Sequence, residues 1–115
     1  MSDLSAKIAT LSAWIDASYP PEIIGTELHV RRRTDKLAEE TGEVVEAVGG
    51  FYAENPRKGR THTQEDILKE LLDVMTTAAG AYESITGNRG RVIDALDRHL
   101  DGLLFRVGLT PEGVQ

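Results

Sequence analysis

Two short patterns of acidic residues carry the clearest chemical potential in this sequence. Glu40 and Glu43 are three residues apart in the first pattern, and Glu70 and Asp73 are three residues apart in the second. On a helix, residues at this spacing lie one turn apart on the same side. Two such helices packed face to face would gather four carboxylates in one small volume. Clustered negative charge is costly without a cation, and an all-oxygen set suits Mg²⁺ or Mn²⁺.

The expected position of Glu40 on its helix strengthens this interpretation. At 100° per residue, Glu40 lies roughly 40° from Val44, inside the apolar stripe, and Glu43 lies at the edge of that stripe. A glutamate within an apolar stripe is expensive to bury in its ionised form without a partner. Glu39 projects to the opposite, solvated side of the same helix.

Apolar residues at spacings of three and four predict an all-α chain, because no segment alternates in the manner of a strand. The first helix carries Leu4 to Ile15 and stops before Pro20, the second spans about 26–54, the third lies between Thr63 and Gly87, and the fourth lies between Asn88 and Val107. The second and third are long enough to form the centre of a four-helix bundle, in a single domain spanning residues 1–115.

The third predicted helix has a capped start and a clear apolar stripe. Thr63, with Asp66 three residues on, is a cap for this helix, and Asn88 is a cap candidate for the fourth. The stripe that we expect to be buried comprises Ile67, Leu71, Val74, Met75, Ala78 and Tyr82. Thr77 and Ala81 continue the side that bears the carboxylates, and their small side chains would leave room for a ligand.

Composition narrows the classes of function. The 115 residues are 40% hydrophobic and 28% charged with a net charge of −6, which argues against disorder and against a broad basic surface for nucleic acid. There is no cysteine, so no disulfide framework or thiolate metal site is expected. No signal peptide or long apolar run is recognisable, and we therefore expect a cytoplasmic protein without membrane contact.

Acidic pairs at this spacing are often only solvated helix faces, and facing carboxylates also occur in bundles that bind two irons. Those di-iron bundles add a Glu-x-x-His pattern. None of His29, His62 and His99 follows an acidic residue by three positions, so the sequence disfavours a di-iron centre.

The residues around both patterns resemble those of the MazG-like, all-α nucleoside triphosphate pyrophosphohydrolases. The family pattern E-E-x-x-E is met by Glu39-Glu40-Thr41-Gly42-Glu43, and the later E-x-x-D is met by Glu70-Leu71-Leu72-Asp73. The flanking segments Lys36-Leu37-Ala38 and Val44-Val45-Glu46-Ala47 also match. The resemblance covers about residues 28–82, and the whole chain fits the family domain in length and helix order.

The resemblance implies a four-helix bundle of the MazG-like type and a Mg²⁺-dependent hydrolase, with Mn²⁺ an alternative metal. Such an enzyme converts a nucleoside triphosphate into the monophosphate and pyrophosphate, and one role would be to clear non-canonical nucleotides. Carried over by position, Glu40, Glu43, Glu70 and Asp73 correspond to the metal ligands. Glu39 matches the first glutamate of the motif, although its projected side argues against a ligand role.

Basic residues supply candidate phosphate contacts. Lys36 lies one turn before Glu40 and can reach either a phosphate or a glutamate of the first pattern. Relatives often carry Lys, Asn and Arg or Tyr on the last helix to hold phosphates and base. Arg98 and Arg106 can replace the basic groups there, whereas Asp101 stands near the expected Asn, so base contacts are not specified.

Two other functions stay open. A phosphoribosyl-ATP pyrophosphatase would share the helices and the metal chemistry. A catalytically silent association module would instead balance the carboxylates with Arg31–Arg33 across an interface, one of these arginines facing inward on its helix.

We expect a homodimer or a homotetramer. Val45 lies about 100° from the Val44 stripe, and Leu72 and Ala79 lie well off the Leu71 stripe, so both long helices have more than one apolar side. The resemblance points the same way, because relatives assemble with pockets at or near subunit contacts.

Overall fold

A computed structural model describes residues 3–109, and within this range the chain is all-helical with no strand. The elements are α1 (Asp3–Asp16), the short 3₁₀ helix η1 (Pro21–Ile23), α2 (Glu27–Phe51), α3 (Gln64–Thr86) and α4 (Val92–Arg106). The predicted all-α class and the order of the four helices are thus confirmed. None of these helices is both long and apolar enough to cross a membrane.

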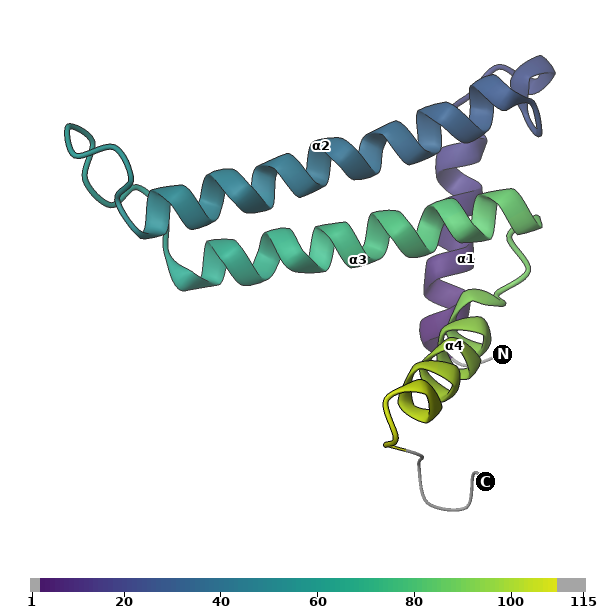
Figure 1. The fold of residues 1–115 in the computed structure, drawn as a ribbon. Coiled ribbons are helices and arrows are strands. Elements are labelled where there is room, and N and C mark those ends of the chain that lie inside the picture. The colour runs from purple at the N-terminus through teal and green to yellow at the C-terminus, as the bar shows by residue number, and fades with distance from the viewer. Residues whose placement is uncertain (1–2, 110–115) are drawn as a thin grey trace.

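The two long helices α2 and α3 form an antiparallel hairpin that dominates the structure (Figure 1). Helix α1 crosses one end of this hairpin and packs mainly on α3, while α4 projects away from the hairpin (Figure 1). Helix α4 approaches α1 and α3 but makes no backbone approach to α2. The four helices therefore do not close into a bundle within one chain.

The start of α3 confirms the capping prediction. Thr63 Oγ1 accepts a hydrogen bond from the Asp66 backbone N–H, and the Asp66 carboxylate accepts one from the Thr63 N–H at 2.8 Å. The backbone hydrogen bond from Thr63 is the main reason that the pKa of Asp66 is lowered. The reciprocal pair fixes the residue at which the hairpin's second helix begins.

The start of α4 corrects the prediction for Asn88. Asn88 has a positive φ of 59° and belongs to the turn after α3, so it does not cap α4. The fully buried Glu83 carboxylate of α3 instead accepts hydrogen bonds from the backbone N–H groups of Gly90, Arg91 and Val92, at 2.6, 2.8 and 2.8 Å. Glu83 of the preceding helix thus caps α4 in place of a residue next to its first turn.

The connection between α2 and α3 folds back onto the end of α2. A side chain on Gly50 would collide with Thr61 and His62, so a glycine is needed for this close approach. Thr61 N–H donates to the Gly50 carbonyl at 3.0 Å. Arg60 Nε donates to the Phe51 carbonyl at 2.9 Å, and its guanidinium lies 4.7 Å from the centre of the Phe51 ring.

Burial on α3 differs from the prediction. Leu71, Met75 and Tyr82 of the expected core stripe are exposed, Met75 by 64%. The more buried side of α3 is the one with Val74 and Ala81. Periodicity identifies an apolar stripe on a helix, but it does not show whether the same chain covers that stripe.

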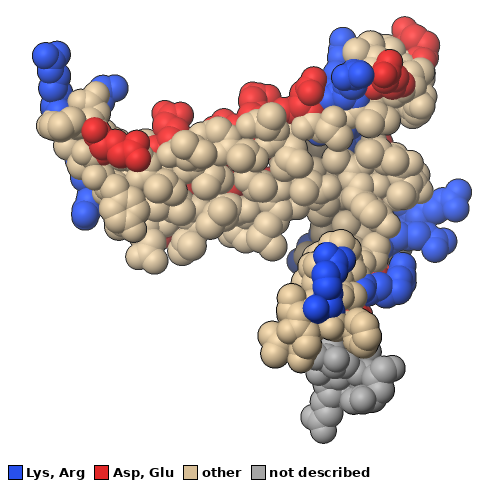
Figure 2. All heavy atoms as spheres, in the orientation of Figure 1, with Lys and Arg blue, Asp and Glu red and all other residues tan. Residues whose placement is uncertain are grey.

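A single chain buries few large apolar side chains. The buried hydrophobic residues among those described are Ala9, Ala47, Ala81 and Val92. The radius of gyration is 17.6 Å, whereas a compact domain of 100 residues has a value of about 13 Å. The α3 seam, defined here as Leu68, Leu72, Met75 and Tyr82, is exposed, and Figure 2 shows little charge over α3.

Candidate metal centre

Three predicted carboxylates meet between the long helices. Glu40 and Glu43 of α2 and Glu70 of α3 each offer one oxygen atom, and these atoms all lie within 4.8 Å of one another. The antiparallel hairpin brings the motifs together because each lies on the side of its helix that approaches the other. Within residues 3–109 this acidic group has the donor chemistry and spacing that suit a cation.

Burial separates the members of the two motifs. The Glu40 and Glu70 side chains are only 13% and 20% exposed. Glu43 is exposed at the open side of the cluster. Glu39 is 66% exposed and is not a member of the converged group. Asp73 does not belong to the converged group, and its Oδ2 accepts a hydrogen bond from Lys69 at 3.0 Å.

Two lysines offset part of the negative charge. Lys36 Nζ lies 3.5 Å from Glu39 Oε1 and 3.8 Å from Glu40 Oε1. Lys69 Nζ lies 3.7 Å from Glu70 Oε1, in addition to its bond with Asp73. The hydrogen bond and charge of Asp73, with the Glu70 charge, raise the pKa of Lys69. Both lysines are mostly exposed, so exchanging these pairs for another cation costs little.

One oxygen atom in the cluster lacks a hydrogen-bond partner. Glu70 Oε2 is buried and accepts no hydrogen bond from the described part of the chain. A buried acceptor without a partner carries a desolvation cost of about 1–3 kcal/mol. The all-oxygen donor set and this orphaned atom both fit a bound Mg²⁺. Glu70 is thus the ligand candidate with the strongest physical support.

A cavity of about 610 Å³ opens beside the cluster. Helices α1, α2 and α3 all line it, and Glu40, Glu39 and Lys36 form its wall on the cluster side. The opposite wall is α1, with Ile8, Leu11, Ser12 and Ile15; α3 supplies Thr76, Thr77 and Gly80. The volume is within the range of small-molecule sites. Thr77 lines the cavity as predicted, whereas Ala81 is buried and does not.

The predicted phosphate contacts of the last helix lie elsewhere. Arg98 and Arg106 are exposed on α4, and neither lines the cavity. Because α4 does not approach α2, a single chain does not bring these arginines to the carboxylates. Lys36 is the predicted basic residue that borders both the cavity and the cluster.

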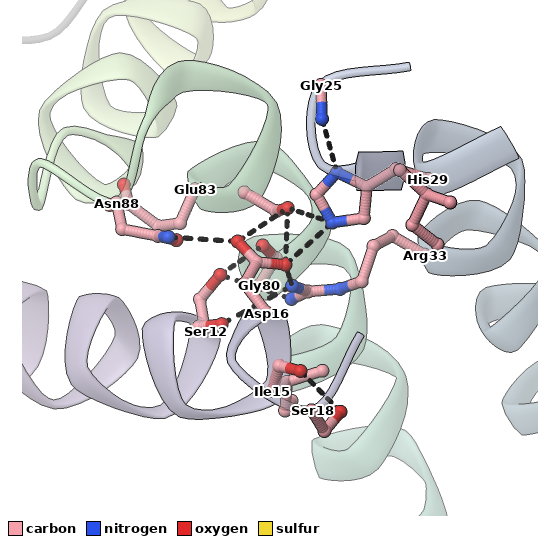
Figure 3. A network of polar contacts seen from close by, with 12 residues as sticks. Ser12, Ile15, Asp16, Ser18, Gly25, His29, Arg33, Gly80, Glu83 and Asn88 are labelled. Atoms are coloured by element: carbon pink, nitrogen blue, oxygen red, sulfur yellow. Dashed lines mark hydrogen bonds and ion pairs between the residues drawn. The ribbon is translucent and has the colours of Figure 1, made fainter. Parts of the chain in front are cut away.

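A second polar group, missed by the motif analysis, lies at the crossing of α1 with the hairpin (Figure 3). We call it the Asp16 junction: Ser12, Asp16, His29, Arg33, Ser84 and Asn88. Arg33 is the inward-facing arginine of the basic run and is buried, as is His29. The one available signal was that a run of three arginines on a helix must turn one member inward.

Comparisons with models of known protein families, with curated proteins and with solved structures give no match to this chain.

Proposed function

We propose that this protein is a cytoplasmic, Mg²⁺-dependent nucleoside triphosphate pyrophosphohydrolase that yields the monophosphate and pyrophosphate. The observation that carries the proposal is the meeting of Glu40, Glu43 and Glu70 beside a cavity of about 610 Å³. The motif resemblance to the MazG-like enzymes supports the choice of reaction, and Mn²⁺ is an alternative metal.

The chain's own residues divide the work between the cluster and the cavity. Glu40, Glu43 and Glu70 would hold the metal, and Asp73, which is paired with Lys69, is the fourth candidate ligand. Lys36, at the border of the two, contacts a phosphate, and the largely apolar far wall receives the nucleoside. A Mg²⁺ ion bound there supplies charge neutralisation and an activated water for phosphoryl transfer.

A phosphoribosyl-ATP pyrophosphatase would use the same carboxylates, so geometry does not separate it from the leading proposal. The silent association module is less well supported. It needs arginines free to balance the carboxylates, yet Arg33 is bound to Asp16, and Arg31 pairs with Glu27 at 3.1 Å. Within the described chain, only Arg32 of the run makes no ion pair.

The test is Mg²⁺-dependent turnover of canonical and modified nucleoside triphosphates, with phosphoribosyl-ATP in the same panel. We expect the products to be a monophosphate and pyrophosphate, identified by chromatography. Orthophosphate as the primary product would refute the proposed reaction, and turnover of phosphoribosyl-ATP alone would favour the alternative. No turnover and no effect of Mg²⁺ on stability would favour the silent module.

We also propose that the protein is a homo-oligomer with a dimer as its basic unit and a tetramer as an alternative. The α3 seam has residues at spacings of four, three and seven, which place them on one stripe of the helix. Helix α4 leaves Leu96, Leu100 and Phe105 exposed as well. A second copy that covers these residues would supply the apolar burial that one chain lacks.

Sedimentation at micromolar concentration tests this assembly. Leu72→Lys should shift the protein towards the 12.6 kDa monomer, because it places a charge within the seam. Glu46→Lys, at an exposed polar position of α2, is the control and should leave the assembly unchanged. A wild-type protein that sediments as a monomer with full activity would contradict the proposal.

A further inference from the structure

We propose that the Asp16 junction positions α1 as the far wall of the cavity and so sets the affinity for the nucleoside part of the substrate. This inference rests on the proposed function, but its residues are separate from the carboxylate cluster. Its members would act through the position of α1 and not through the reacting atoms.

Asp16, at the end of α1, is the centre of the junction (Figure 3). Its carboxylate accepts hydrogen bonds from Arg33 Nη1, from His29 Nε2 at 2.8 Å, from Ser84 Oγ at 2.8 and 2.9 Å, and from Asn88 Nδ2 at 2.9 Å. Partial burial by itself would raise the pKa of Asp16, but the hydrogen bonds from Asn88, His29 and Ser84 and the Arg33 charge lower it overall. The ionised carboxylate thus ties α1 to both helices of the hairpin.

Arg33 extends this tie to the cavity wall. Its Nη2 donates to Ser12 Oγ at 3.1 Å, and Ser12 Oγ donates in turn to the Gly80 carbonyl at 3.0 Å. A side chain at position 80 would place its first carbon 3.0 Å from Arg33 Nη2, so Gly80 leaves the space that the guanidinium occupies. Ser12, Arg33 and Gly80 all line the cavity. Residues of the junction therefore also form part of the cavity wall.

The arrangement of serine, histidine and aspartate does not form a nucleophilic triad. His29 Nδ1 accepts a hydrogen bond from the Gly25 N–H at 3.0 Å, which leaves the ring proton on Nε2 facing Asp16. Ser84 also meets Nε2, at 3.2 Å, and donates to Asp16. No basic nitrogen is available to take a proton from the Ser84 hydroxyl. The role of this group is therefore structural, and it holds α1 against the hairpin.

Helix α1 packs on α3 mainly through small side chains. Leu4, Leu11 and Trp14 are exposed, Trp14 by 73%. The buried residues of α1 are small: Ser5, Ala9 and Ser12. The metal-ligand candidates all come from α2 and α3. A weakened junction should displace the cavity wall while leaving the carboxylates in place.

The test compares Ser84→Ala and Arg33→Lys with wild type in the Mg²⁺-dependent assay. We expect KM for the nucleotide to rise roughly fivefold to tenfold, as loss of one hydrogen bond that positions the wall implies. The kcat value and the inhibition constant of pyrophosphate, which has no nucleoside, should change less than about twofold. Ser84→Thr keeps the hydroxyl and should restore KM, whereas Ser18→Ala removes an exposed hydroxyl bound only to Ile15 and is the control.

Amide exchange of α1 provides a readout that needs no turnover. Exchange in residues 3–16 should speed up in Ser84→Ala, while exchange around Glu40 and Glu70 should not. An unchanged KM in both junction variants would overturn the inference, as would unchanged α1 exchange or an equal loss of pyrophosphate binding. Inactivity of wild type would instead refute the proposed function, and the exchange data would then decide whether the junction positions α1.

Discussion

Two groups of charged side chains lie at the α2–α3 hairpin, and they differ in how many hydrogen-bond donors their carboxylates receive. At the Asp16 junction, four side chains donate to one carboxylate. In the middle of the hairpin, three carboxylates face one another, and the buried Glu70 Oε2 accepts no hydrogen bond from the described chain. The Asp16 carboxylate thus has a full set of donors and the Glu70 carboxylate does not, although the Asn88 Oδ1 atom at the junction is also buried without a partner in the described chain.

The difference separates a structural role from a ligand-binding role. A buried charge with several partners stabilises the arrangement that supplies those partners, and removing one partner is strongly destabilising. Like charges held together raise the free energy of the folded chain until a cation joins them. Charge removal should therefore have opposite effects on stability at the two places.

The largest expected effect is on activity at the carboxylate cluster. We expect Glu40→Gln, Glu43→Gln, Glu70→Gln and Asp73→Asn each to lower Mg²⁺-dependent hydrolysis roughly 100- to 1,000-fold, because each removes a metal-ligand charge. Circular dichroism should show unchanged helix content. Glu46→Gln on the exposed side of α2 is the matched control. Full activity in any two of the four variants would refute the site.

At the junction, the largest expected effect is on stability. Asp16→Asn should lower the free energy of unfolding by about 3 kcal/mol, because it leaves the buried Arg33 without its counter-charge. Urea denaturation measures this change. Asp97→Asn, on an exposed turn of α4, should change the unfolding free energy by less than about 0.5 kcal/mol. Equal effects of Asp16→Asn and Asp97→Asn on the unfolding free energy would contradict a structural role for the Asp16 junction.

The stability contribution of Asp16 should also depend on pH with a defined sign. The pKa of Asp16 is lowered in the folded chain, so the unfolded chain binds the proton more readily. The stabilisation is therefore fully present above the unfolded pKa of about 3.9 and is lost as pH falls through the lower folded value. The difference in unfolding free energy between wild type and Asp16→Asn should stay constant from pH 7 to 5 and shrink towards pH 3. A constant difference at all these pH values would contradict this assignment.

The smallest expected effect has the opposite sign. Without metal, Glu40→Gln should raise the free energy of unfolding by about 0.5 kcal/mol, because it relieves repulsion between like charges. Mg²⁺ should raise the melting temperature of wild type more than that of the variant, since the metal stabilises only a chain that binds it. A destabilised Glu40→Gln protein in the absence of metal would show that this carboxylate has a structural partner.

The sequence predicted the features that depend on local spacing. Helix order, the Thr63 cap and the side of α2 that bears Glu40 follow from periodicity within one element, and they agree with the structure. The approach of Glu70 to Glu40 and Glu43 could be predicted because an antiparallel hairpin joins the two motifs.

The features that depend on distant partners could not be predicted. Glu83 and Asp16 have the local surroundings of solvated acids, yet one caps α4 and the other receives donors from α2, α3 and the turn after it. The exposed stripe of α3 was assigned to the core because periodicity shows that a face is apolar, but not which surface covers it. The distance of Arg98 and Arg106 from the carboxylates could not be predicted for the same reason, since periodicity does not show which helices pack together. Helix α4 does not approach α2 within the chain.

The attachment of α4 through Glu83 has a consequence for how the chain behaves on dilution. Three backbone N–H groups at the start of α4 are fixed by one buried carboxylate, but the later turns expose Leu96, Leu100 and Phe105. Such a helix is attached to the rest of the chain only at its N-terminal end, and its later turns fray unless another surface covers them. If a second copy provides that surface, slow amide exchange over residues 96–106 should disappear below the association concentration, while α2 and α3 keep theirs. The order of α4 would then be a property of the assembly and would report directly on its dissociation.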